Sequence, residues 1–283
     1  MNFDDPREKS DEEVRVPTTV GDILNLLHSL APSELAESWD NVGLMLGGLD
    51  EEVRGIVLGL DPVDGLLDEA IGKGANLVIT HHPAIFRPLK KIDTGEPEGA
   101  FIARSLRENI NIISCHTNLD SAAGGVNDVL AAALGLQGIR PLVPNSASTE
   151  QGIGMGRIGE YSPPITGEQF IAGVKKACGL EFVFSAGKPV SEVSSVALCG
   201  GSGSDLAVIA KRAGAQVYVT SEVKHSVACW AGQADFWILD AGHFATENPV
   251  VSFLAGFLQQ KMAEKGMEPP VWQCRQCAPL QLI

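Results

Sequence analysis

The chain has 283 residues, of which 45% are hydrophobic and 20% charged, and its formal net charge is −14. A chain of this length typically folds into about two domains, each with its own core. An acidic protein repels phosphate backbones unless its basic residues are segregated, and the sequence contains no long Lys/Arg run. We therefore do not expect duplex nucleic acid as a direct partner.

Hydropathy and cysteine usage indicate the compartment. No apolar stretch approaches the ~20 residues that span a membrane, and the first residues lack the apolar core of a signal peptide. The six cysteines are scattered, which favours reduced core thiols over a disulfide framework. Cys274 and Cys277 form a single Cys-x-x-Cys pair without the other two ligands of a zinc site, which favours a structural role. We expect a cytoplasmic protein without membrane contact.

The first expected elements follow an acidic tail. Residues 1–16 contain almost no apolar side chains and are expected to be flexible. Thr19 is a candidate N-cap for a helix that ends at Leu30, because apolar residues then recur at helical spacing. Residues 38–48 form a polar loop that leads into a short strand. Three residues of this loop either shape a pocket or only pack and turn the chain: Trp39, Asp40 and Asn41.

A pattern of strand, helix and strand occurs twice, over residues 55–80 and 194–220. Sliding the chain by 140 positions aligns the two units without a gap and gives these identities: Leu58/Leu198, Leu66/Leu206, Ala70/Ala210, Gly74/Gly214, Ala75/Ala215 and Thr80/Thr220. The matches predict an internal duplication. The predicted fold class is therefore α/β, with two similar α/β domains. Domain 1 comprises residues 17–130 and 240–283, and domain 2 comprises residues 131–239.

Two adjacent histidines end the second strand of the first unit. Residues 77–80 are a short, mostly β-branched apolar run, and His81, His82 and Pro83 follow. Neighbouring side chains of a strand point to opposite faces, but beyond its carboxyl end both rings can turn toward one cleft. Open α/β sheets bind ligands at that edge. A lone buried histidine is more often a core group than a ligand, so the doublet needs further support.

Each half then repeats a second pattern, in which a strand is followed by a histidine and, four residues later, by a carboxylate. After residues 110–115 and after residues 236–239 these pairs are His116 with Asp120, and His243 with Glu247. Where a strand turns into a helix, a separation of four lets both side chains reach one point. Packing alone seldom produces the doublet and two such pairs at equivalent points, so the pattern favours metal binding.

Together these strand ends offer three imidazoles and two carboxylates without a thiolate: His81, His82, Asp120, His243 and Glu247. A ligand set of nitrogen and oxygen suits Zn, Mn, Fe or Ni more than a closed thiolate site. Glu247 is able to bridge two ions, and five protein ligands over two ions leave positions open for water. We predict two divalent transition-metal ions in the cleft between the domains.

Two glycine-rich segments are weaker motifs. Residues 199–205 follow an expected strand and open a helix, so they either cradle a phosphate or form a tight turn. Residues 152–156 are a glycine-rich entry into the second domain.

Four segments resemble the signature motifs of the Nif-three-like proteins, which are often labelled GTP cyclohydrolase I type 2 homologues: Ser38–Gly43, Thr80–Pro83, His116–Asp120 and Gly242–Glu247. The resemblance covers the chain from about Pro17 to about Gln259. It implies two similar α/β domains per chain and a toroidal homohexamer. It also implies which ligands share an ion: His82 with Asp120, His81 with His243, and Glu247 with both.

One segment departs from the family pattern. Members often carry Gly-Asp and then a histidine pair where this chain has residues 221–226. Glu222 still accepts hydrogen bonds there, and His225 can act as a proton shuttle or support a ligand. We take these two residues and His116 as the candidate catalytic residues.

Two functions of different classes follow from these residues. The first is a dinuclear metal-dependent hydrolase, in which metal-bound hydroxide attacks a small molecule that is a nucleotide or resembles a phosphoester. Opening of the GTP purine ring, the activity in the family label, would be one instance. The alternative is a metal-binding regulatory or scaffold protein without turnover. The bridging carboxylate and the open coordination positions favour the hydrolase, because a structural ion needs neither.

Overall fold

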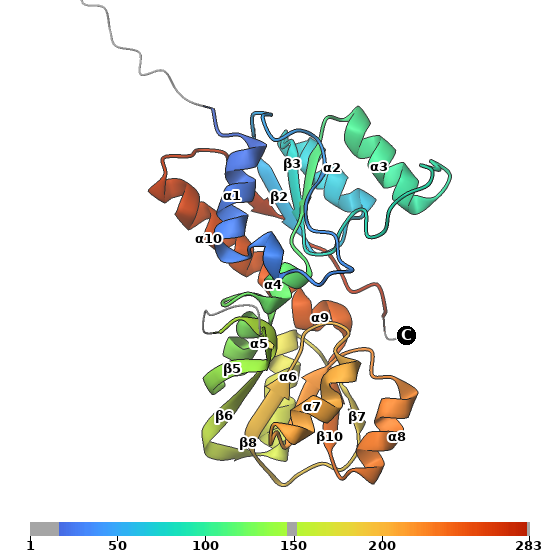
Figure 1. Ribbon diagram of the computed structural model, residues 1–283, viewed down its shortest axis with the longest axis vertical. Coiled ribbons are helices and arrows are strands. Elements are labelled where there is room, and N and C mark those ends of the chain that lie inside the picture. The colour runs from blue at the N-terminus through green and yellow to red at the C-terminus, as the bar shows by residue number, and fades with distance from the viewer. Residues whose placement is uncertain (1–16, 146–151, 282–283) are drawn as a thin grey trace, which may run out of the picture.

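The computed structural model describes residues 17–145 and 152–281, and Figure 1 shows them as two lobes stacked along the long axis of the molecule. The expected acidic tail, residues 1–16, lies outside the described residues. No helix within the described ranges is long and apolar enough to cross a membrane. The mixed α/β class predicted from the sequence is confirmed.

The upper lobe is built on a five-stranded sheet in the order β1, β4, β3, β2, β11. Its strands are β1 (Gly43–Leu46), β2 (Ile56–Gly59), β3 (Leu77–Thr80), β4 (Asn111–Ser114) and β11 (Val271–Gln273). The neighbours from β11 to β4 are parallel, and β1 lies antiparallel at the edge. Both faces are covered, because side chains along a strand alternate between two cores.

Four main helices cover this sheet: α1 (Val20–Leu30) and α10 (Pro249–Glu264) on one face, and α2 (Asp64–Lys73) and α3 (Pro97–Arg107) on the other. The predicted start of α1 is confirmed, since the hydroxyl of Thr19 accepts from the backbone N–H of Asp22 while the Asp22 carboxylate accepts from Thr19 N at 2.9 Å. A 3-10 turn, η1 (Ser33–Leu35), follows α1.

The lower lobe has a six-stranded sheet in the order β5, β6, β8, β9, β10, β7. Its strands are β5 (Gln137–Pro144), β6 (Gly154–Thr166), β7 (Phe184–Ala186), β8 (Glu192–Leu198), β9 (Val217–Thr220) and β10 (Trp237–Asp240). Only β8, β9 and β10 are parallel to one another. Its helices are α5 (Val126–Ala133) and α6 (Gly167–Cys178) on one face, and η2 (Ser204–Leu206), α7 (Ala207–Arg212) and α8 (His225–Gln233) on the other.

The offset of 140 positions reappears in the pairing of the strands. Ile56 pairs with Leu77 in the upper sheet, and Val196 pairs with Val217 in the lower one. A side-chain amide also ties equivalent backbone positions in each lobe. Asn76 accepts from Arg54 N and donates to Glu52 O, both at 2.8 Å. Gln216 accepts from Ser194 N at 2.7 Å and donates to Glu192 O at 3.4 Å. These matches support the predicted duplication, which remains a prediction.

The chain passes to the lower sheet between β4 and β5 and returns between β10 and β11. Two short helices lie where the lobes meet, α4 (Thr117–Ser121) after β4 and α9 (His243–Glu247) after β10. Helix α5 contacts both β6 of the lower lobe and α10 of the upper lobe. Because α5 contacts both lobes, the domain limits drawn from the sequence stay a prediction. The carboxyl ends of β3, β4, β9 and β10 all face the junction between the lobes.

Candidate metal centre

The doublet His81 and His82 leaves the upper sheet directly after β3. Its backbone stays attached to the end of β2 and the residue that follows it, because His81 N donates to Gly59 O at 3.3 Å and His82 N donates to Leu60 O at 3.0 Å. The two rings are tilted by 49° with centroids 4.9 Å apart. Both rings therefore turn toward the junction between the lobes, as the sequence predicted for a doublet beyond the pleat.

His81 faces two carboxylates. Its Nε2 lies 3.7 Å from Asp120 Oδ1 and 3.7 Å from Glu247 Oε1. All three residues are buried. Asp120 comes from α4 in the upper lobe and Glu247 from α9 at the junction, so this group combines three separate strand ends.

A second group shares Glu247. Its Oε2 lies 3.1 Å from His82 Nε2 and 3.0 Å from His243 Nε2, and these two ring nitrogens are 3.3 Å apart. In this spacing His82 lies with His243 and His81 lies with Asp120, while His81 and His82 are also within reach of His116. The pairing that the resemblance implied remains a prediction. Each ring is anchored through Nδ1, and the Nε2 of His82 faces Glu247 and His243.

Three polar atoms of these groups are buried without a hydrogen bond: His81 Nε2, Asp120 Oδ1 and Glu247 Oε2. Buried polar atoms are nearly always hydrogen-bonded, because leaving them unpaired costs free energy. Glu247 Oε2 is close to two ring nitrogens, yet neither contact has hydrogen-bond geometry. The three atoms therefore lie near one another without forming hydrogen bonds. The donor set fits divalent transition-metal ions, which prefer imidazole and carboxylate ligands.

Every histidine at the junction has its Nδ1 next to an oxygen acceptor. The acceptors are Cys115 O for His81 at 2.8 Å, Asp61 Oδ1 for His82 at 2.7 Å, Asp40 Oδ1 for His116 at 2.8 Å, and Glu222 Oε1 for His243 at 2.9 Å. An acceptor at Nδ1 favours the tautomer that carries its proton there and leaves the Nε2 lone pair free. Metal-binding histidines are typically oriented in this way.

The negative charge of the site shifts the pKa values of its groups when no cation is present. The adjacent Glu247 carboxylate raises the pKa of His243 to about 9. Burial disfavours the charged form of His82, but the hydrogen bond to Asp61 and the adjacent Glu247 carboxylate outweigh it and raise the pKa of His82 to about 10. Burial raises the pKa of Asp120 to about 7. Protons and a metal ion therefore compete for the same atoms.

His116, one of the predicted catalytic residues, lies beside both groups. Its ring centroid is 5.2 Å from that of His81 and 5.5 Å from that of His82. Asp40 fixes it and also accepts from Thr117, through the backbone N at 3.0 Å and the hydroxyl at 2.5 Å. Burial opposes the charge on Asp40, but the hydrogen bonds from His116 and Thr117 hold its pKa well below the ordinary value. Asp40 does not itself line the cavity at this site, but it holds two residues that do, His116 and Thr117.

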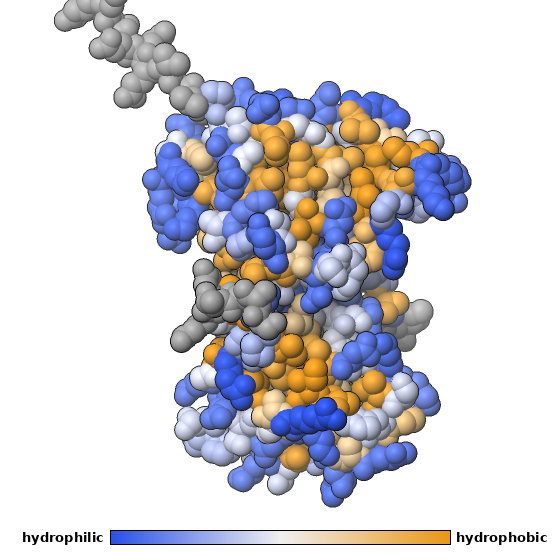
Figure 2. Space-filling model, in the orientation of Figure 1, coloured by the Kyte–Doolittle hydropathy of each residue, from blue (hydrophilic) through white to orange (hydrophobic). Residues whose placement is uncertain are grey.

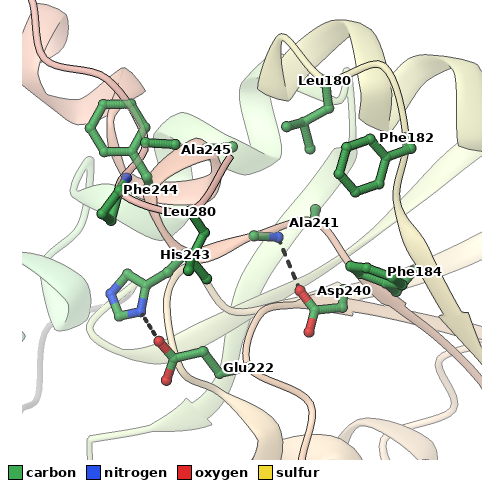
Figure 3. Close-up of a pocket in the computed structure, with 13 residues that line it drawn as sticks. Leu180, Phe182, Phe184, Glu222, Asp240, Ala241, His243, Phe244, Ala245 and Leu280 are labelled. Atoms are coloured by element: carbon green, nitrogen blue, oxygen red, sulfur yellow. Dashed lines mark hydrogen bonds and ion pairs between the residues drawn. The ribbon is translucent and has the colours of Figure 1, made fainter. Parts of the chain in front are cut away.

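The other two predicted catalytic residues have different places. Glu222 accepts from His243 Nδ1, which makes it a positioning residue for that ring (Figure 3). Its φ of 52° is unusual for a residue with a side chain, and such backbone conformations concentrate at functional sites. His225 is exposed on α8, where its Nε2 lies 3.5 Å from Cys229 Sγ. Of the groups described above, it joins neither.

Three further residues support the site, of which the sequence singled out neither Asp61 nor Gln276. The sequence does contain a signal for Asp61, because this carboxylate follows closely after β2, the strand that pairs with β3. Gln276 has none: its Oε1 accepts from Leu60 N at 2.6 Å and Asp61 N at 3.1 Å, and its Nε2 donates to Asp61 O at 2.7 Å. It thereby holds the backbone that presents Asp61.

Gly201 is the third of these residues, and it decides between the two interpretations of residues 199–205. Its φ is +64°, and a Cβ there would lie 1.9 Å from Glu247 Oε1 and 3.2 Å from His243 Nε2. Its backbone N donates to Thr246 Oγ1 at 3.0 Å. The glycine-rich segment is therefore a tight turn that lets lower-lobe backbone lie against the carboxylate.

Two cavities adjoin the site and meet at His243. One, of about 350 Å³, is lined by Asp120, Glu247 and His116 together with aromatic side chains. The other, of about 280 Å³, is mostly apolar and brings residues of the lower lobe and of the C-terminal segment together: Leu180, Phe182, Phe184, Phe244 and Leu280 (Figure 3). Viewed from one side, apolar residues also reach the surface in both lobes near the junction (Figure 2). The candidate ligands are thus accessible to a small molecule.

Comparison with known proteins places this geometry in a family. The Duf34/NIF3 (NGG1p interacting factor 3) family matches residues 18–277. A Streptomyces coelicolor protein named GTP cyclohydrolase 1 type 2 homolog is 35% identical over 233 residues, which are 81% of this chain and 82% of that protein. A Clostridium acetobutylicum protein of the same name is 32% identical over 252 residues, covering 89% and 94%.

Solved structures agree with the sequence relatives. A Bacillus cereus protein related to NIF3 superposes with a TM-score of 0.89 at 26% identity, over 95% of this chain and 100% of that one. A Staphylococcus aureus hypothetical protein gives a TM-score of 0.88 at 28% identity, with the same coverage. The matched region contains every residue of the candidate metal centre, and the chain therefore belongs to the Duf34/NIF3 family.

Proposed function

We propose that this protein is a metal-dependent hydrolase that uses two divalent transition-metal ions. His81, Asp120 and Glu247 would hold one ion, and His82, His243 and Glu247 the other. The observation that carries the proposal is that the two groups contain three buried polar atoms without hydrogen bonds, namely His81 Nε2, Asp120 Oδ1 and Glu247 Oε2. The histidine rings of both groups are in addition anchored through Nδ1. A protein that bound nothing there would leave these atoms unpaired at a cost in stability.

Ions bound at this site supply Lewis acidity and lower the pKa of water. The chain itself supplies orientation and proton transfer. We assign proton transfer to His116 Nε2, because the Nδ1 of that ring is held by Asp40 and the ring lies beside the histidine doublet. Glu222 and Asp61 keep the rings of His243 and His82 in place.

The proposed substrate class rests on the volume of the cavity beside the metal ligands, on the net charge of the chain and on the name of the relatives. A cavity of about 350 Å³ suits a small molecule rather than a polymer. The chain has a net charge of −14, so it repels an anionic substrate unless cations neutralise the site. We propose a nucleotide or a phosphoester-like substrate, in keeping with the name GTP cyclohydrolase 1 type 2 homolog that the relatives carry.

We extend the proposal to assembly on the basis of the resemblance described above, and to compartment on the basis of the cysteine usage. The protein would act in the cytoplasm as a homohexameric ring. Light scattering of the purified protein tests the ring, because six chains of 29.9 kDa differ clearly in mass from one or two.

The test of the proposed function combines metal content with turnover. Protein purified without chelator or acid should hold about two transition-metal ions per chain, as the two ligand groups require. A screen of nucleotides and phosphoesters with added Zn, Mn, Fe or Ni should reveal turnover that is lost in Asp120→Ala. Metal without any turnover would favour the scaffold alternative, and absence of metal would refute the site.

A further inference from the structure

An exposed aromatic pair faces the candidate metal centre across the larger cavity. Trp39 is 59% exposed and Phe86 is 37% exposed, although both are large apolar side chains. Their ring centroids are 5.9 Å apart in an edge-to-face arrangement, and each lies near the ring of His116, at 6.4 Å and 6.1 Å. Both line the cavity that also contains Asp120, Glu247 and His243.

The loop that presents Trp39 is fixed on both sides. Asp40 binds His116 and Thr117, and Glu37 N donates to Thr117 Oγ1 at 2.9 Å. Asn41 Nδ2 donates to Ile85 O at 2.6 Å, which ties the loop of Trp39 to the segment of Phe86. An aromatic side chain that is held in place by its neighbours and still exposed is preorganised to contact a ligand.

We propose that Trp39 and Phe86 bind a planar unsaturated ring of the substrate, so that the ring lies between this aromatic wall and the metal ligands. The inference rests on the proposed function and sharpens it from phosphoesters in general to molecules that carry a flat heterocycle, such as a nucleobase. Aromatic side chains stack on any such ring because every base has a π face. Without such a ligand, both aromatic side chains leave apolar surface exposed to water, which is unfavourable.

The test compares guanosine 5′-monophosphate with ribose 5-phosphate, which carries the same phosphate and sugar without the ring. The full-length protein should bind the nucleotide more tightly. Trp39→Ala should weaken nucleotide binding by roughly tenfold or more and leave ribose 5-phosphate binding unchanged, since stacking contributes at that level. Trp39→Phe, which keeps an aromatic ring, should retain most of the affinity.

Phe184→Ala is the matched control, because Phe184 is 69% exposed and lines the other cavity beside His243. This variant should bind the nucleotide like wild type. A loss in Phe184→Ala instead of Trp39→Ala would place the ring in the other cavity and overturn the proposal. Equal affinity of wild type for the two compounds would overturn it as well.

A second measurement needs only wild type and the conservative variant Trp39→Phe. Bound nucleotide should protect Trp39 fluorescence in wild type from acrylamide quenching, with Trp39→Phe identifying the signal of that residue. If Trp39 is already shielded in the ligand-free protein, a second copy of the chain covers it and the proposal is wrong.

Metal content, measured on every sample, separates the two ideas. Wild type that holds metal but shows no preference for the ring contradicts only the aromatic wall. Wild type that prefers the ring but holds no metal contradicts only the hydrolase.

Discussion

The two lobes share a scaffold but differ at the carboxyl end of one strand. In the upper lobe, β3 is followed by His81 and His82, whose Nε2 atoms face carboxylates. In the lower lobe, 140 positions later, β9 is followed by Ser221 and Glu222. Ser221 donates to Gly201 O at 2.6 Å, and Glu222 accepts from His243. The upper strand end provides candidate ligands, and the lower one holds candidate ligands in place.

At the ends of the next strands, β4 and β10, the two lobes are alike. Asp120 is the fourth residue of α4 in a five-residue helix, and Glu247 is the last residue of α9, also of five residues. Each carboxylate follows a histidine by four positions. The candidate site therefore belongs to neither lobe alone. It exists only where the two sets of strand ends meet.

The largest effect is expected from the residue that both groups share. Glu247→Gln keeps the size of the side chain but removes the charge that faces His81, His82 and His243, so it should abolish binding of both ions. His225→Ala is the control, since that residue is exposed on α8. Elemental analysis of both proteins provides the measurement. Equal metal retention in the two variants would show that Glu247 does not bridge the groups.

A side chain added at Gly201 would disturb the contact between the lower-lobe turn and Glu247. Gly201→Ala would place a Cβ 1.9 Å from Glu247 Oε1, so the carboxylate must move. Gly74→Ala is a matched control, because Gly74 has a φ of +67°, close to the +64° of Gly201, and its Cβ would meet nothing within 4 Å. Both variants bear the same backbone strain of about 1–2 kcal/mol.

We expect Gly201→Ala to lower metal affinity by more than about 100-fold, beyond the effect of losing a supporting hydrogen bond. Gly74→Ala should lower thermal stability alone. If titration with Zn or Mn gives the same affinity for both variants, the turn does not position Glu247.

The anchors of the rings give a smaller and graded effect. Asp61→Asn and Glu222→Gln each weaken the hydrogen bond at a histidine Nδ1, and such changes typically cost about 10- to 100-fold in metal affinity. Asp61 should matter more, because its side chain is 32% exposed whereas that of Glu222 is 59% exposed. The same metal titration measures both. A larger loss in Glu222→Gln would reverse the order that burial predicts.

Much of this site could be predicted from the sequence, and the reason lies in its chemistry. His81, His82, Asp120, His243 and Glu247 stand out because imidazoles and carboxylates at strand ends recur in two halves of the chain. The orientation of the rings could not be predicted, because it depends on Nδ1 acceptors that come from other segments of the chain.

Asp61 and Gln276 illustrate the limit. They are 215 positions apart, and nothing in the local pattern around Gln276 indicates that it holds the backbone that presents Asp61. His225, three positions after Glu222, is exposed on α8 and belongs to neither ligand group, so its catalytic role stays a prediction. Local patterns predict elements and candidate ligands, whereas long-range hydrogen bonds decide orientation.

The mildest perturbation leaves the sequence unchanged and alters only pH. The pKa values of His82 and His243 are raised to about 10 and about 9 without a cation, so both rings are protonated at neutral pH until metal displaces the protons. Affinity should therefore fall as pH decreases from about 9, by about tenfold per unit for each proton displaced. Asp120, with a pKa of about 7, should steepen the fall below that pH. Affinity that stays constant between pH 9 and 7 and weakens only below the ordinary histidine value of ~6.5 would contradict these shifts.

The most direct test of the account is an anomalous-difference map from crystals of the protein purified without chelator, recorded at the absorption edge of its metal. We expect two peaks at the junction of the lobes, one beside His81 and Asp120 and the other beside His82 and His243, with Glu247 between them. Peaks that pair His82 with Asp120 would contradict the grouping. No peak at the junction would contradict the claim that the two lobes together form a metal centre.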